Sequence, residues 1–321
     1  MHVGVNGVRL YVDIEGAGLV PDGPRMREKP TLVLLHGGPG FDHSMYKPSF
    51  STLSDIVQIV YYDHRGCGRS ENGPTDLWKL DQWGDDVRAL CDTLGIEKPI
   101  VLGTSFGGFV AQAYATRHPG HAAKLILVST AARFDFQQVY AAFERLGGGE
   151  AEHAARSYWS APSDTTRAVY SKVCVPLYAP RNRADDGAWV ARAISRNETG
   201  VHFNGPANEQ GRFDFRDALA RVTSPVLVMA GDKDPITPIA FSETIAACLP
   251  PEQVEFQRFA GCGHGIVADD QDSALQAIRD FVLAQGVASA AYSTSLSRGR
   301  PGFCRATSTK PARRNTLSGP T

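Results

Sequence analysis

The sequence GTSFG at residues 103–107 has the pattern G-x-S-x-G, and it stands between an apolar run at 99–102 and a stretch with helical character at 107–118. A strand that leads directly into a helix predicts a sharp turn, which would expose the hydroxyl of Ser105. The two glycines favour such a turn because they let backbone segments approach closely and tolerate strained dihedral angles. A serine in this place could also act only as a helix N-cap. Its interpretation therefore depends on partner residues elsewhere in the chain.

Composition and charge exclude several classes of protein. The 321 residues are 42% hydrophobic and 21% charged, which is typical of a globular protein with one elaborated domain or two modest ones. A formal net charge of −1 gives no electrostatic reason to expect nucleic acid or an anionic membrane as a partner. Neither a secretory signal nor an apolar run of about 18 residues is found. We therefore expect a cytoplasmic protein without a membrane span.

Neither the spacing of the cysteines nor any nucleotide-binding motif in the sequence indicates a cofactor. The six cysteines include no C-x-x-C pair and are widely scattered, at Cys67, Cys91, Cys174, Cys248, Cys262 and Cys304. This spacing favours reduced thiols over a disulfide framework or a zinc site. No Rossmann or Walker motif occurs, and no histidine cluster has metal-ligand spacing. We therefore expect no cofactor and no metal, with a small molecule or short peptide as substrate.

Short apolar strands alternate with helices on both sides of a long helical segment. After a predicted β-hairpin at 2–14 and a Gly/Pro-rich loop at 16–30, the pattern predicts strands at 31–35, 57–62, 100–102, 125–128, 226–230 and 254–259. Helices are predicted at 80–94, 107–118, 239–248 and 272–285. The strands are almost wholly apolar, as in a parallel sheet that is covered on both faces. This alternation predicts a doubly wound α/β sheet formed by residues 1–131 and 216–286.

Two segments fall outside this alternation. Residues 132–215 show no strand pattern and contain helix-like stretches at 136–146, 164–173 and 186–194, so we interpret them as an inserted helical cap. Residues 287–321 are rich in Ser, Thr, Gly and Pro, and from Arg298 onward they carry six basic residues and no acidic one. Such a composition buries too little apolar surface to offset its ordering entropy. It predicts a disordered basic tail.

Residues that can carry chemistry follow two further strands. Asp232 and Asp234 lie in GDKDP at 231–235, and His264 lies in GCGHG at 261–265. A serine becomes a good nucleophile when a base lies within hydrogen-bond reach and a third group orients that base. Each of these residues follows a strand at its carboxyl end, where parallel sheets place their ligands. Ser105, an aspartate and His264 therefore form a candidate catalytic set.

The chain resembles the α/β-hydrolase superfamily over about residues 2–285, through the order Ser…Asp…His. HGGPG at 36–40 together with DHRGCGRS at 63–70 most resembles the proline iminopeptidase group of serine peptidases. The resemblance implies an α/β-hydrolase fold with a cap and a triad of Ser105, His264 and Asp234, with Asp232 as the alternative acid. It also implies an oxyanion hole formed by the backbone amides of Gly38 and Phe106.

The resemblance implies release of N-terminal residues from short peptides or amides through an acyl-enzyme. Related peptidases bind the free amine with cap glutamates, and Glu198, in RNETGVHFN at 196–204, is similar to one of them. The W-x-x-W-E pattern that carries the other glutamate is missing. A carboxylesterase or lactonase, for example one acting on acyl-homoserine lactones, remains the alternative. A non-hydrolytic member of the fold and a binding protein are further alternatives.

Four polar residues near these motifs have structural interpretations. His36 and Asp63 belong to the two motifs and are expected to shape their loops. Asp85 and Asp86 lie near the start of a predicted helix, where carboxylates interact favourably with the helix dipole.

Overall fold

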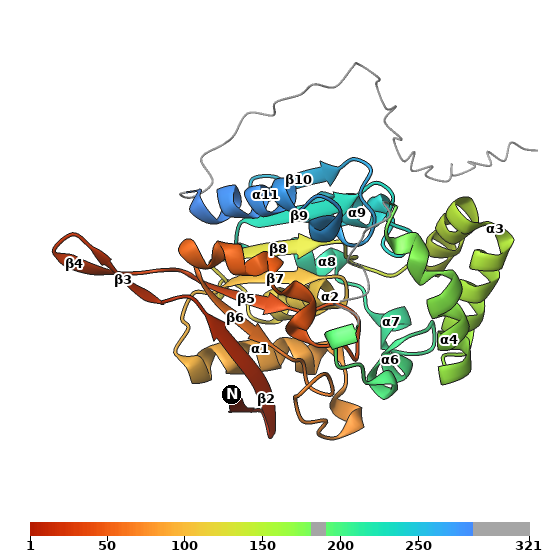
Figure 1. Cartoon of the computed structure of the whole chain (residues 1–321), viewed down its shortest axis with the longest axis horizontal. Helices are drawn as coiled ribbons and strands as arrows, with labels where there is room; N and C mark the ends of the chain where they lie inside the picture. The colour runs from red at the N-terminus through yellow and green to blue at the C-terminus, as the bar shows by residue number, and fades with distance from the viewer. Residues whose placement is uncertain (181–190, 285–321) are drawn as a thin grey trace, which may run out of the picture. The chain divides into compact units, whose positions relative to one another are not determined.

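The computed structural model describes residues 1–180 and 191–284, and a mostly parallel sheet organises them. Eight strands follow the order β1-β2-β6-β5-β7-β8-β9-β10 (Figure 1). Their bounds are β1 His2–Val5, β2 Val8–Glu15, β5 Thr31–Leu35, β6 Gln58–Tyr62, β7 Ile100–Thr104, β8 Lys124–Val128, β9 Val226–Gly231 and β10 Val254–Phe259. β1 and β2 pair antiparallel, as do β2 and β6, and all other neighbours pair parallel. The predicted doubly wound α/β fold is confirmed.

Helices cover both faces of this sheet, because successive strand side chains point to opposite sides. In β5, Val33 and Leu35 belong to one hydrophobic cluster, and Leu32 and Leu34 belong to another. The first cluster packs against α1 (Leu80–Leu94), α2 (Phe106–Arg117) and α9 (Ile239–Cys248). The second packs against the 3-10 helix η2 (Ser49–Asp55) and α11 (Gln271–Leu283). The apolar strands are therefore buried on both faces, as the sequence indicates.

The predicted helix at 80–94 is confirmed residue for residue as α1. Trp83, Val87 and Leu90 are fully buried on its apolar face. The helix ends at Gly95, whose φ of 69° is the left-handed conformation that glycine adopts without steric cost. At Gly84, a Cβ atom would lie 2.8 Å from the backbone nitrogen of Tyr114. The glycine therefore permits the close crossing of α1 and α2.

The prediction of a loop at 16–30 is wrong, because this segment contains a second β-hairpin. β3 (Leu19–Asp22) and β4 (Arg25–Glu28) pair with each other and form a separate two-stranded sheet. Figure 1 shows this hairpin projecting away from the body of the chain. All of its residues except Val20 are exposed. Since neither face packs on a core, the sequence shows no alternation of apolar and polar residues.

The segment between β8 and β9 is helical, as predicted. It contains α3 (Phe136–Ser160), α4 (Asp164–Val173), the 3-10 helix η4 (Val175–Tyr178), α6 (Asn197–Phe203), α7 (Glu209–Arg212) and α8 (Arg216–Leu219). α3 consists of two helices joined by a kink at Gly148, whose φ of 71° and ψ of −172° are not helical. The first corresponds to the helix predicted at 136–146, and the second, which runs to Ser160, was not predicted. We call residues 132–215 the insertion. Its two ends lie together, since the amide of Phe215 donates to the carbonyl of Ala132 at 2.8 Å.

Some predictions fall on residues that the structure leaves out. Most of the helix expected at 186–194 lies in 181–190, and the expected tail at 287–321 lies beyond 284, so both are outside the described residues. Among the helices of the described part of the chain, none combines the length and the apolar character that crossing a bilayer requires.

Candidate active site

Ser105 occupies the sharp turn between β7 and α2. Its φ of 55° and ψ of −118° are uncommon for a residue with a side chain, and such strain is found at functional sites. The flanking glycines make the turn possible. A Cβ atom at position 103 would lie 2.2 Å from the carbonyl oxygen of Gly107, and one at position 107 would lie 2.0 Å from that of Leu35. The G-x-S-x-G pattern therefore reflects backbone contacts on both sides of the serine.

A chain of hydrogen bonds links Ser105, His264 and Asp234. The serine Oγ lies 2.9 Å from His264 Nε2, and His264 Nδ1 lies 2.8 Å from Asp234 Oδ2. The Asp234 side chain is 1% exposed and the His264 side chain 14% exposed. Because the Asp234 carboxylate accepts a hydrogen bond from His264 Nδ1, the imidazole carries its proton on Nδ1. This leaves Nε2 free to accept a hydrogen bond from the serine hydroxyl. The structure thus brings together the three side chains that the sequence singled out.

Four donors hold the Asp234 carboxylate. Its Oδ1 accepts from the backbone amides of Ile236 at 2.8 Å and Thr237 at 2.9 Å. Its Oδ2 accepts from the Thr237 hydroxyl at 2.6 Å, in addition to His264. A buried carboxylate needs such donors, since burial without them costs several kcal/mol. These bonds fix the plane of the carboxylate against the imidazole.

Asp232, the alternative acid, has a different partner. Its Oδ1 accepts from the backbone amide of Gly261 at 2.8 Å, so it joins the loop after β9 to the loop after β10. Two residues along, the chain has turned, and Asp234 rather than Asp232 points to His264. The choice between them depends on this turn, which the sequence alone does not define.

The loop that carries His264 is held by the insertion. The His264 amide donates to the carbonyl of Tyr178 at 2.9 Å, and the two rings meet edge to face with centroids 5.2 Å apart. A Cβ atom at Gly263 would lie 2.1 Å from the same carbonyl oxygen, which explains the glycine before the histidine. Tyr178 was missed in the sequence, because it follows no motif and contacts His264 only in the folded chain.

The HGGPG loop lies beside the serine. A Cβ atom at Gly37 would lie 3.3 Å from the Cβ of Ser105, and Gly38 has a φ of 57°. Phe106 is the first residue of α2, where backbone amides have no acceptor within the helix. In the described residues, the amides of Gly38 and Phe106 donate to no backbone carbonyl. Both amides are therefore available to a ligand next to Ser105.

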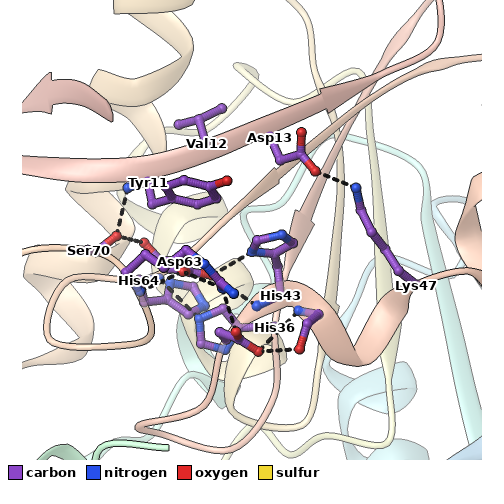
Figure 2. A network of polar contacts seen from close by, with 12 residues as sticks. Tyr11, Val12, Asp13, His36, His43, Lys47, Asp63, His64 and Ser70 are labelled. Atoms are coloured by element: carbon purple, nitrogen blue, oxygen red, sulfur yellow. Dashed lines mark hydrogen bonds and ion pairs between the residues drawn. The ribbon is translucent and has the colours of Figure 1, made fainter. Parts of the chain in front are cut away.

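The HGGPG loop at 36–40 is hydrogen-bonded to the second motif, DHRGCGRS at 63–70, and Figure 2 shows His36 and His64 of the two motifs close together. His36 Nδ1 donates to the carbonyl of Gly37 at 3.0 Å, and its Nε2 accepts from the amide of His64 at 3.1 Å. The amide of Gly40 donates to the Cys67 sulfur at 3.3 Å. Burial lowers the pKa of His36 and lowers that of His64 still further, so both imidazoles are neutral. His36 therefore supports the loop, as expected from the sequence.

Asp63 also has a structural role. Its Oδ1 accepts from the amide of His43 at 2.9 Å and from His43 Nδ1 at 2.7 Å, and its Oδ2 accepts from the amide of Arg69 at 2.8 Å (Figure 2). Burial acts to raise the pKa of Asp63, but the hydrogen bonds from the His43 side chain and the Arg69 backbone amide hold it below the ordinary value. Asp63 is fully buried, and its hydrogen bonds to His43 and Arg69 hold the loops after β5 and β6 together.

A cavity of about 580 Å³ opens beside Ser105 and His264, between the core and the insertion. This volume is in the range of small-molecule sites. Aromatic rings form much of its wall, contributed by Phe41, Phe106, Phe109, Phe134, Trp159 and Phe203. Among the described residues that line it, none is Asp or Glu, and Arg167 carries the permanent charge. The cavity suits an apolar group, with a cation at one point of its wall.

Glu198 does not reach this cavity. It lies in α6, its side chain is exposed, and it is not among the lining residues. The predicted binding of a substrate amine by Glu198 finds no support in this geometry. The described residues also contain no cluster of three His, Cys, Asp or Glu side chains that could hold a metal ion.

The sheet order, the strained serine turn and the hydrogen-bonded Ser-His-Asp chain define a hydrolase of the α/β class. The chain belongs to the alpha/beta hydrolase fold family, whose model matches residues 30–271, and it is a hydrolytic enzyme.

Individual relatives have several activities in their names. A proline iminopeptidase, PfmaB of Pestalotiopsis fici, is 29% identical over 282 residues, which cover 85% of this chain and 98% of the relative. The crystal structure of a proline iminopeptidase from Mycobacterium smegmatis aligns with a TM-score of 0.70 and 23% identity, over 88% of this chain and 97% of that one. An esterase from Exiguobacterium antarcticum gives 0.69 and 20%, over 88% and 99%. At these identities the structural matches show the shared fold.

Proposed function

We propose that the protein is a serine hydrolase in which Ser105, His264 and Asp234 are the catalytic triad. The observation that carries this proposal is the pair of hydrogen bonds, 2.9 Å and 2.8 Å long, that joins the three side chains. The strained backbone of Ser105 and the apolar cavity beside it support the same assignment. Asp232, bonded to Gly261, is then a structural residue.

The reaction follows from this arrangement. Ser105 Oγ attacks the substrate carbonyl carbon while His264 Nε2 takes the hydroxyl proton, and Asp234 stabilises the imidazolium that forms. The amides of Gly38 and Phe106 donate to the carbonyl oxygen as it becomes negative. When the carbonyl re-forms, the bond to the leaving group breaks and His264 gives that group the proton. A water molecule then enters, loses a proton to His264, and releases the acid and the free serine.

The wall of the cavity favours carboxylic esters or lactones as substrates. Aromatic rings bind apolar acyl groups well, and about 580 Å³ can enclose a small ester. A peptide substrate would bring a free amine, which binds best to a carboxylate. No described residue of the lining supplies one. We therefore propose that ester hydrolysis is the principal activity. From the sequence, this activity is the alternative to peptide cleavage.

Proline iminopeptidase activity is the second candidate. It is supported by the HGGPG and DHRGCGRS motifs and by the 29% identity to a relative of that name over nearly its whole length. A substrate panel separates the two candidates. We expect faster turnover of p-nitrophenyl butyrate or hexanoyl-homoserine lactone than of proline-p-nitroanilide, by the ratio of kcat/KM.

The Ser105→Ala variant provides the control for this panel. It should keep the circular dichroism spectrum of the wild type and lose turnover of every substrate in the panel. Brisk cleavage of the prolyl substrate with slow cleavage of both others would replace the esterase proposal with the peptidase. Turnover that survives in Ser105→Ala would remove this serine from the mechanism.

A further inference from the structure

Arg167 is a cation on the wall of a largely apolar cavity. It lies in α4 and is half-buried. Its Nη2 donates to the Ser195 hydroxyl at 3.2 Å, while its Nη1 is buried and has no hydrogen-bond partner among the described residues. A guanidinium group carries five N–H donors, and leaving a buried donor unsatisfied costs free energy. The triad described above does not use this group.

The guanidinium lies close to the HGGPG loop and lines the same cavity as Ser105. A Cβ atom built at Gly200 would lie 3.1 Å from Arg167 Nη1 and 3.2 Å from the carbonyl oxygen of Pro39. The guanidinium carbon also lies 5.8 Å from the centroid of the Phe41 ring. Both Pro39 and Phe41 line the cavity. One ligand in this cavity can thus contact the loop beside Arg167 and place a carbonyl group at Ser105.

Neutral polar groups accompany the cation. Asn204 and Tyr158 also line the cavity, and Asn204 Nδ2 donates to the Tyr158 hydroxyl at 2.5 Å. Because this bond uses an acceptor lone pair of the hydroxyl, the Tyr158 O–H remains a donor. The same Cβ position at Gly200 lies 3.8 Å from Asn204 Nδ2, so Arg167 and Asn204 share one side of the wall. This part of the wall presents donors, and its charge is positive.

We propose that Arg167, with Tyr158 beside it, binds a carboxylate carried by the substrate, so that the preferred substrates are acidic esters such as monoesters of dicarboxylic acids. A carboxylate can accept two parallel hydrogen bonds from a guanidinium, and such bonds are strong where water is excluded. It would also satisfy the unpaired Nη1. This inference rests on the proposed ester hydrolysis and adds the class of ester.

Matched chromogenic esters test the proposal. Mono-p-nitrophenyl glutarate and p-nitrophenyl pentanoate have acyl chains of equal length, and only the first carries a carboxylate. We expect wild-type kcat/KM to be higher for the glutarate ester by roughly tenfold or more, the range of a charge-assisted hydrogen bond. In Arg167→Gln this ratio should fall to near one or below. Arg167→Lys should give an intermediate ratio, because lysine keeps the charge but lacks the planar fork.

A surface arginine of the same insertion serves as the control. Arg145 lies exposed in α3 and does not line the cavity, so Arg145→Gln removes the same charge and should keep the wild-type ratio. An equal ratio in the wild type and Arg167→Gln would overturn the proposal. So would a fall in the ratio of the same size in Arg145→Gln, since that would reflect net charge rather than a binding site.

A binding measurement keeps the test independent of turnover. Monomethyl glutarate is titrated by calorimetry into Ser105→Ala and into Ser105→Ala/Arg167→Gln, with thermal unfolding to check that both are folded. Binding to the first variant that is lost in the second supports the subsite even if esters are not cleaved. Equal binding to both, or binding to neither, overturns it. Failure of ester cleavage alone would count against the proposed function and not against the subsite.

Discussion

The Asp234 carboxylate has the most completely defined surroundings of any residue in the candidate site. Two backbone amides, the Thr237 hydroxyl and the His264 imidazole all donate to it. Each bond constrains the orientation of the carboxylate, and through it the imidazole presents an unprotonated Nε2 to Ser105. The reactivity of the serine is therefore expected to depend on this one acid.

Replacement of Asp234 by asparagine tests that dependence. The amide of Asp234→Asn can donate to His264 Nδ1 and so favours the tautomer whose proton lies on Nε2, facing the serine. We predict a fall in kcat of about 10⁴, the size found when a triad acid is changed in this way. Steady-state kinetics with an ester substrate measure it. Asp232→Asn is the matched control, since its side-chain oxygen still accepts from Gly261 and its kcat should stay close to that of the wild type. An equal fall in kcat in both variants would contradict the assignment.

The sequence predicted these residues to different extents. Ser105 and His264 could be identified because glycine-rich turns at strand ends mark them. Asp232 and Asp234 lie in the same turn, and only the folded loop separates their partners. Tyr178 and Arg167 could not be found, because both belong to the insertion, where helical spacing gives no indication of which side chains face the core. Glu198 was expected in the site and lies outside it.

At the scale of elements, glycines determine where strands, helices and loops can touch. Gly107 in α2 packs directly on the carbonyl of Leu35 in β5, whereas a Cβ atom at Gly149 in α3 would meet nothing within 4 Å. The two helical glycines differ in how closely their neighbours approach them. Their substitution separates close packing from helix propensity.

We predict opposite effects for Gly107→Ala and Gly149→Ala. The first forces a Cβ atom against a backbone oxygen and should lower the free energy of unfolding by about 1–3 kcal/mol or more. The second should raise it by about 0.4–1 kcal/mol, since alanine restricts the unfolded chain and favours helix. Urea unfolding measures both. A stable, fully active Gly107→Ala protein would show that the turn does not need this contact.

Element prediction succeeded where side chains pack and failed where they do not. The helices α1, α4 and α9 were predicted with their observed bounds, because each has capping or apolar signals that agree with its packing. The β3–β4 hairpin was missed, because its exposed strands lack the alternation that burial imposes. The three successive glycines correctly predict a break, since Gly148 has non-helical φ and ψ, but the second helix of α3 that follows this kink was missed.

On the scale of the whole molecule, the sheet brings three distant parts of the chain together at the carboxyl ends of β7, β9 and β10. The same edge carries the loops after β5 and β6, which contact each other through His36 and His64. The ring centroids of these two histidines lie 4.3 Å apart, and His64 Nε2 is buried with no hydrogen-bond partner in the part of the chain that the structure describes. The stability of this edge therefore depends on both imidazoles remaining neutral.

This requirement predicts a dependence of stability on pH. Burial lowers the pKa of His36 and His64 below the ordinary value of 6.5, so below about pH 6.5 the unfolded chain binds protons that the folded protein does not. The free energy of unfolding should fall as pH decreases from 6.5, by up to about 1.4 kcal/mol per pH unit for each imidazole. The lowered pKa of Asp63 adds a loss only at more acidic pH, as that carboxylate becomes protonated.

The His64→Gln variant isolates one of these contributions. Urea unfolding at pH 7.5, 6.5 and 5.5 should show a shallower decline for the variant than for the wild type, whatever its stability at pH 7.5. Parallel curves would show that the pKa of His64 is the same in the folded protein as in the unfolded chain.

Labelling with a fluorophosphonate tests the central claim most directly, because it reports the activated serine without knowledge of the substrate. We predict one adduct per folded chain in intact-mass analysis, located by peptide mapping at Ser105. Ser105→Ala should take up none, and His264→Ala should react far more slowly, since the hydroxyl then lacks its base. Folded wild-type protein that stays unlabelled, or that carries the adduct at another residue, would contradict the account.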